Sequence, residues 1–106
     1  MAENQNENLQ EMQMLDQNLH NILLQKQAFQ MELSETKSAM VEIEKSSEIF
    51  KLIGELMIKT GKEKVREELL SKEKILNMRV KSIEKQEDSL AKRLEELRNK
   101  FSKFAK

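Results

Sequence analysis

The residues best suited to chemistry are few in this 106-residue chain, and their spacing fits none of the usual reactions. His20 is the only histidine and there is no cysteine, so the ligands for a zinc site are missing. Gly54 and Gly61 belong to no phosphate-binding loop of the GxGxxG or GxxxxGK type. The neighbouring carboxylates Glu67 and Glu68 fall in a charged segment, with no cleft to raise a pKa. We therefore expect no enzyme activity, no cofactor and no metal.

The composition favours long helices over a globular domain. Charged residues make up 36% of the chain and aromatic residues 4%, and proline is absent. Such a chain cannot fill a compact core of this size. The lack of cysteine suits a reducing compartment. No apolar run approaches 18 residues and no signal peptide is evident, so we expect a soluble, cytoplasmic protein.

The apolar segment 49–61 holds both glycines, and we interpret residues 48–60 as a β-hairpin. Gly54-Glu55 is a two-residue loop with glycine first, which is typical of a type II′ turn and requires a positive φ at Gly54. Folding about this loop pairs Ile53 with Leu56, Leu52 with Met57, Lys51 with Ile58, and Phe50 with Lys59.

An isolated two-stranded hairpin is marginally stable in water and has two unpaired edges. We therefore expect this hairpin to join strands from other chains. The predicted assembly residues are Ile49, Phe50, Leu52, Ile53, Gly54, Leu56, Met57 and Ile58.

Heptad repeats on both sides of the hairpin predict two long helices, at about 8–47 and 61–104, with residues 1–7 as a disordered start. Thr60-Gly61-Lys62-Glu63 fits a capping box at the second helix. In the first helix the a positions are Met12, Leu19, Lys26, Leu33 and Met40, and the d positions are Leu15, Ile22, Phe29, Thr36 and Ile43. In the second, the d positions are Leu69, Leu76, Ile83, Leu90, Leu97 and Phe104, and the a positions are Arg66, Glu73, Val80, Glu87, Leu94 and Phe101.

The two repeats and the hairpin share one fold-back point. In an antiparallel pair an a position faces a d position, and the residue numbers of Met12 and Leu97, or of Leu15 and Leu94, add up to 109, as they do for Ile53 and Leu56. Residues 1–47 carry a net charge of −5 and residues 62–106 a net charge of +5, so the helices should attract each other. We predict a mostly α fold: a single unit over 8–106, in which an intrachain antiparallel coiled coil is joined by the hairpin.

The same register leaves apolar residues unpartnered at the far end of the coiled coil. Phe101 falls opposite Asn8, and Phe104 opposite Gln5. An exposed apolar patch usually marks a binding surface, and methionine suits contacts with varied partners. Equally, the two phenylalanines could form the last layer of the core. The predicted tip surface comprises Leu9, Met12, Met14, Leu97, Phe101 and Phe104.

The order helix, hairpin, helix resembles the beta subunits of the prefoldin family, most closely the archaeal ones. The resemblance is carried by EIFKLIG at 48–54 and LMIK at 56–59, and further by QKQ at 25–27, KEK at 62–64 and KQE at 85–87. It covers roughly residues 8–104. The chain departs from many relatives at the turn, where Glu55 stands in place of proline.

The resemblance implies that four such chains join two alpha-class chains through their hairpins, which form a double β-barrel. It further implies an ATP-independent chaperone that holds unfolded client proteins at the coiled-coil tips and passes them to a group II chaperonin. Two other classes stay open. The chain could be a structural coiled-coil scaffold without client binding, or its second helix could bind nucleic acid, although the interleaved acidic residues argue against this.

Overall fold

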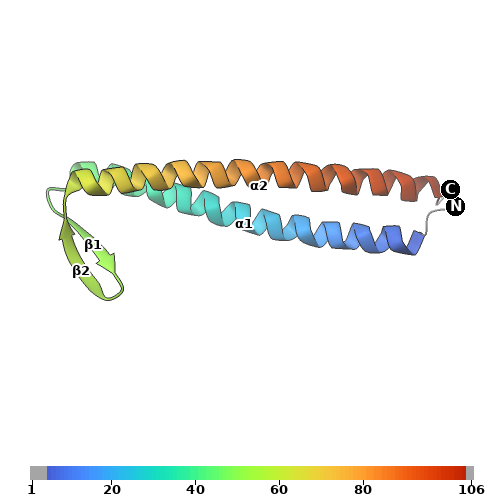
Figure 1. Cartoon of the computed structure of the whole chain (residues 1–106), viewed down its shortest axis with the longest axis horizontal. Coiled ribbons are helices and arrows are strands. Elements are labelled where there is room, and N and C mark those ends of the chain that lie inside the picture. The colour runs from blue at the N-terminus through green and yellow to red at the C-terminus, as the bar shows by residue number, and fades with distance from the viewer. Residues whose placement is uncertain (1–4, 105–106) are drawn as a thin grey trace. The chain divides into compact units, whose positions relative to one another are not determined.

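The computed structural model describes residues 5–104, and this part of the chain forms two helices and two strands (Figure 1). The elements follow one another as α1 (Gln5–Lys45), β1 (Ile49–Ile53), β2 (Leu56–Thr60) and α2 (Lys62–Phe104). The predicted mostly α fold, with two long helices joined by a β-hairpin, is confirmed. Helix α1 begins at Gln5, so residues 5–7 of the expected disordered start are helical. Residues 1–4 lie outside the described part.

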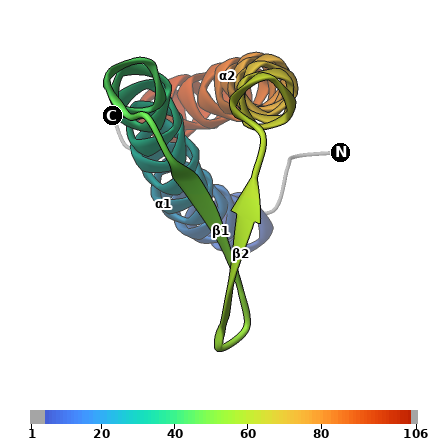
Figure 2. The same ribbon diagram turned by 90° about the vertical axis from the view of Figure 1, so that its left-hand side faces the viewer.

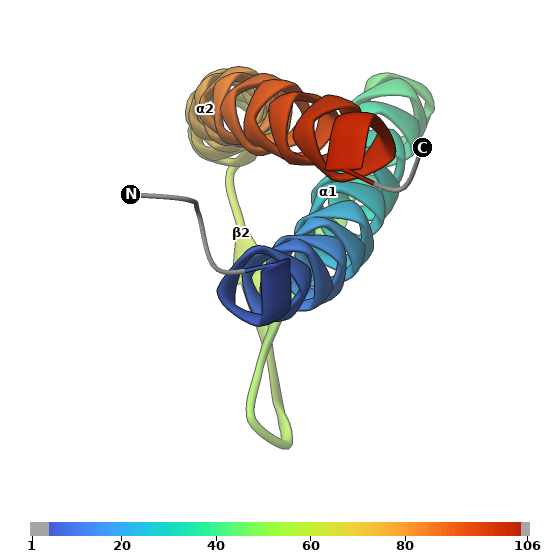
Figure 3. The same ribbon diagram turned by 90° about the vertical axis from the view of Figure 1, so that its right-hand side faces the viewer.

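The chain divides into two compact units. Within the described residues, unit 1 comprises 5–28 and 81–104, and unit 2 comprises 29–80. Each unit pairs a segment of α1 with an antiparallel segment of α2. Figure 3 faces the end of unit 1, where the first turns of α1 and the last turns of α2 lie. Unit 2 contains the hairpin, which extends from the end of α1 and the start of α2 (Figure 2).

The core of unit 1 follows the predicted heptads. Leu15, Leu94 and Leu97 form one buried cluster, and Leu97 has no exposed surface. Leu15 and Leu94 are one of the pairs whose numbers add up to 109, so the predicted fold-back register is confirmed in this unit. Burying one leucine fully contributes about 1.5–3 kcal/mol. The partly buried residues packed against this cluster are Met12, Leu19 and Leu90.

The core of unit 2 is built from the same heptad positions. Leu76 and Ile43 are buried, and so is Thr36, a polar residue at a d position. The Thr36 hydroxyl donates a hydrogen bond to the backbone carbonyl of Glu32 at 2.7 Å. Because this bond satisfies the hydroxyl, a threonine is tolerated in the apolar seam.

The start of α2 differs from the predicted capping box. The Val65 amide donates to the Gly61 carbonyl at 3.2 Å, which makes Gly61 the residue that caps the helix. Thr60 cannot be the cap because it is the last residue of β2 and pairs with Ile49. The carboxylate of Glu63, which the box would need, is bonded to Arg66 instead.

The hairpin has the predicted register. Ile53 pairs with Leu56 and Leu52 with Met57 in an antiparallel ladder. Gly54 has a φ of +60°, and no non-glycine residue in the described range has a positive φ. A type I′ turn needs positive φ at both central residues, so these φ values exclude type I′ and fit the type II′ turn that the leading glycine predicts.

Candidate interaction surfaces

The hairpin presents apolar side chains on both of its faces. Successive residues of a strand point to opposite faces, so Phe50 and Leu52 lie on one face and Ile49 and Ile53 on the other. The large apolar side chains from Phe50 to Ile58 are 46–70% exposed. Within residues 5–104, neither helix covers them. So much exposed apolar surface on a two-stranded sheet is typical of a site that another chain occupies.

Both lysines of the strands are neutralised by acidic partners. The Lys51 Nζ lies 3.0 Å from a carboxylate oxygen of Glu68 in α2. The Lys59 Nζ lies 3.6 Å from a carboxylate oxygen of Glu48, directly before β1. These pairs lower the cost of placing the lysines beside apolar surface, which favours burial of the hairpin in an assembly.

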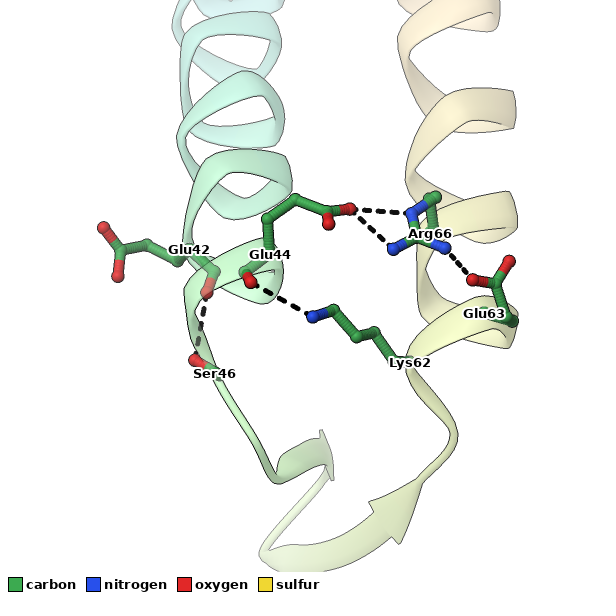
Figure 4. A network of polar contacts seen from close by, with 6 residues as sticks. All are labelled: Glu42, Glu44, Ser46, Lys62, Glu63 and Arg66. Carbon is green, nitrogen blue, oxygen red and sulfur yellow. Dashed lines mark hydrogen bonds and ion pairs between the residues drawn. The ribbon is translucent and has the colours of Figure 1, made fainter.

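A polar cluster ties the end of α1 to the start of α2 at the base of the hairpin (Figure 4). The Arg66 Nε and Nη2 both lie 2.7 Å from the same carboxylate oxygen of Glu44. The Lys62 Nζ donates to the backbone carbonyl of Glu44 at 3.1 Å. Because Glu44 is the second-last residue of α1, these bonds hold the two helix ends together. We call Glu44, Lys62 and Arg66 the base clamp.

The base clamp has a clear electrostatic signature. The hydrogen bond from Arg66 holds the pKa of the Glu44 carboxyl below its ordinary value of 4.5. The same hydrogen bond raises the pKa of Arg66. Both shifts favour the charged pair, so the clamp is intact at neutral pH.

The tip surface is smaller than predicted. Met14 is 64% exposed and Leu9 is 40% exposed, whereas Met12 and Phe101 are half-buried. Leu97 does not belong to this surface, because the cluster with Leu15 and Leu94 buries it completely. Phe104 ends α2, and its side chain lies outside the described part of the structure. Among the described side chains of the predicted tip surface, Leu9 and Met14 are therefore the most exposed.

Every arginine of α2 contacts α1. In unit 1, Arg93 forms two hydrogen bonds to Glu11, at 3.0 and 3.3 Å, which raise the pKa of Arg93. The remaining contacts join Arg98 to Asp16 in unit 1, and in unit 2 join Arg66 to Glu44 and place Arg79 over the Phe29 ring. The three ion pairs agree with the attraction expected between the oppositely charged helices, and they reduce the positive charge that these arginines could offer to phosphates. Neither helix in the described range is apolar enough over its length to cross a membrane.

Known proteins share this arrangement. A family described as "Prefoldin subunit" matches residues 6–106. The prefoldin subunit beta of Thermococcus onnurineus is 43% identical over 88 residues, which cover 80% of this chain and 76% of the relative. That of Pyrococcus furiosus is 36% identical over 96 residues, which cover 88% and 82%. This chain belongs to the prefoldin chaperone family. The crystal structure of the prefoldin beta subunit from Thermococcus strain KS-1 has a TM-score of 0.86 and 33% identity, over 93% of this chain and 90% of that one.

Two polar features of this prefoldin chain escaped the sequence reasoning. The base clamp left only a weak signal, since Glu44 and Arg66 stand one residue away from the fold-back sum of 109. The contact between Lys51 and Glu68 left no signal in the sequence, because heptad and strand periodicities do not predict how a strand lies relative to a helix.

Proposed function

We propose that this chain is a subunit of a cytoplasmic, ATP-independent holdase. It captures non-native proteins, keeps them from aggregating and passes them to a group II chaperonin. Membership in the prefoldin chaperone family supports this proposal. The observation that carries its role as a subunit is the apolar hairpin, whose two faces stay exposed beside two open strand edges.

The hairpin is the assembly surface. Four copies of this chain join two alpha-class subunits through their strands, which close into a double β-barrel. Closing a barrel removes the open edges and buries one face of each hairpin. The exposed pair Leu52 and Met57, which lie opposite each other across the strands, contributes to this interface.

The tip of unit 1 is the client-binding surface. Leu9 and Met14 are its accessible members, and Met12 and Phe101 lie partly buried close by. Unfolded proteins expose apolar segments that aggregate. Several weak tips in one complex hold such a segment by avidity, because binding at one tip raises the effective concentration at the next. Each contact is weak enough to release the client without a nucleotide.

Light scattering tests client binding directly. The chain is reconstituted with an alpha-class subunit, and a denatured model protein is diluted into the complex without ATP. We expect the wild-type complex to suppress aggregation, and the variant Leu9→Ser with Met14→Ser to suppress it severalfold less. A second variant, Phe101→Ser with Phe104→Ser, asks whether the last turns of α2 contribute.

The matched control removes exposed apolar residues from α1 away from the tip. Leu23 and Leu24 belong to unit 1 and are exposed to an extent comparable with the tip residues. We expect Leu23→Ser with Leu24→Ser to leave suppression unchanged. If only the control variant lost suppression of aggregation, the client-binding surface would lie at Leu23 and Leu24 and not at the tip. No suppression by an intact wild-type complex would leave a structural scaffold without client binding.

A further inference from the structure

Apolar packing does not hold the hairpin against the helices of unit 2. Its large apolar side chains from Phe50 to Ile58 remain about half or more exposed. The backbone links on either side are short, residues 46–48 before β1 and Gly61 after β2. Apart from its chain neighbours, no atom lies within 4 Å of where a Cβ of Gly61 would be, so no other residue packs against that side of the link. Two adjacent links alone would let the hairpin rock about the axis that joins them.

The base clamp does not prevent this motion. Its members Glu44, Lys62 and Arg66 belong to the two helices, and their bonds join one helix end to the other (Figure 4). The clamp therefore fixes the distance between the two links but leaves the angle of the hairpin free.

One polar contact within unit 2 lies away from this axis. Lys51 is the third residue of β1, and Glu68 is the seventh residue of α2, about 9 Å along the helix from its start at 1.5 Å per residue. Their side chains meet at 3.0 Å, and each is less than half exposed. Because this bond joins the strand to the helix at a point away from both links, it resists rotation of the hairpin about the axis through the links.

We propose that Lys51 and Glu68 are positioning residues that brace the hairpin at the angle needed to join other subunits. This inference rests on the proposed assembly through the hairpin. The brace adds no contact to the interface itself. Because the brace already restricts the hairpin in the free chain, the hairpin loses less conformational entropy when its strands pair with those of another chain.

The chain carries its own matched control. Lys59 and Glu48 form a second ion pair at the hairpin, at 3.6 Å, but neither residue belongs to a helix. Lys59→Glu breaks this pair and changes the charge of the hairpin as much as Lys51→Glu does, yet it removes no link to α2.

The angle can be measured on the whole chain without any partner. Because the sequence contains no cysteine, Glu55→Cys at the turn and Lys74→Cys in α2 accept spin labels at these two places alone. Both positions are exposed and belong to unit 2. Electron paramagnetic resonance then gives the distribution of distances between the labels.

We expect a narrow distribution for the wild-type background and a broad one for Lys51→Glu. The exchange Lys51→Glu with Glu68→Lys should narrow it again, and 1 M salt should broaden the wild type, because the Debye length falls to about 3 Å. The control Lys59→Glu, which breaks the pair with Glu48, should leave the distribution narrow. A distribution unchanged by Lys51→Glu, or already broad in the wild type, would overturn the brace.

A second readout joins the brace to assembly. Assembly with an alpha-class subunit should be about 1.4- to fivefold slower for Lys51→Glu, the range that corresponds to losing one exposed ion pair. The rate should return in the exchanged pair. If the wild type did not assemble at all, the proposed assembly would fail, whereas the label distances would still decide the brace.

Discussion

Shortening Leu97 should destabilise unit 1 strongly, although the sequence alone predicts an accessible tip residue at this position. Leu97 has no exposed surface and packs with Leu15 and Leu94. Leu97→Ala removes buried methyl groups and leaves a cavity, which costs about 2–5 kcal/mol. At roughly 4–8 °C per kcal/mol for a domain of this size, a loss of about 3 kcal/mol lowers the melting temperature by more than 10 °C.

Circular dichroism at 222 nm follows this unfolding, at one fixed chain concentration. The control is Leu24→Ala, the same chemical change at a leucine of unit 1 that is 51% exposed. We expect the control to change the unfolding free energy by less than about 0.5 kcal/mol. Equal melting temperatures for both variants would refute the assignment of Leu97 to the core and return it to the client-binding surface.

Three further changes test other parts of the structure. Gly54→Val forces a β-branched residue to a φ of +60°, so hydrogen exchange of the strand amides should quicken; unchanged exchange would contradict the turn assignment. Lys26 and Glu87 pair at 3.3 Å in the a positions of unit 1, and replacing both by leucine should keep or raise stability to urea, whereas Lys26→Leu alone should lower it. The pKa of Glu44 is lowered on folding, so the stabilisation from its charged carboxylate is complete above pH 4.5 and is lost as the pH falls below that value. Glu44→Gln should therefore be less stable than wild type at pH 7 but not at pH 3. A difference in unfolding free energy of equal size at both pH values would argue against the bond to Arg66.

Most of the fold could be predicted because it depends on periodicity. The heptad spacing identifies which face of each helix is buried, and this holds even for Thr36, a polar residue at a d position. The position of Gly54 determines the turn, the strand register and the fold-back point together. These features need no knowledge of side-chain geometry.

The polar contacts could not be predicted, because they depend on geometry that periodicity does not contain. Glu63 fits a capping box by spacing, yet the strand that ends at Thr60 keeps the chain extended there, and Glu63 bonds Arg66 instead. Likewise, the contact of Lys51 with Glu68 depends on the angle between a strand and a helix. The burial of Leu97 depends on how far the helices stay in contact toward their ends, which the same heptad pattern leaves open.

The central claim is that the exposed hairpin joins this chain to other subunits, and native mass spectrometry tests it most directly. The chain is mixed with an alpha-class subunit as wild type, as Leu52→Ser with Met57→Ser, and as the control Leu24→Ser with Met31→Ser, which removes exposed apolar side chains from α1. We predict one complex of two alpha-class and four beta-class chains for wild type and control, and free chains for the hairpin variant. A hairpin variant that enters the same complex as the wild type would contradict the account.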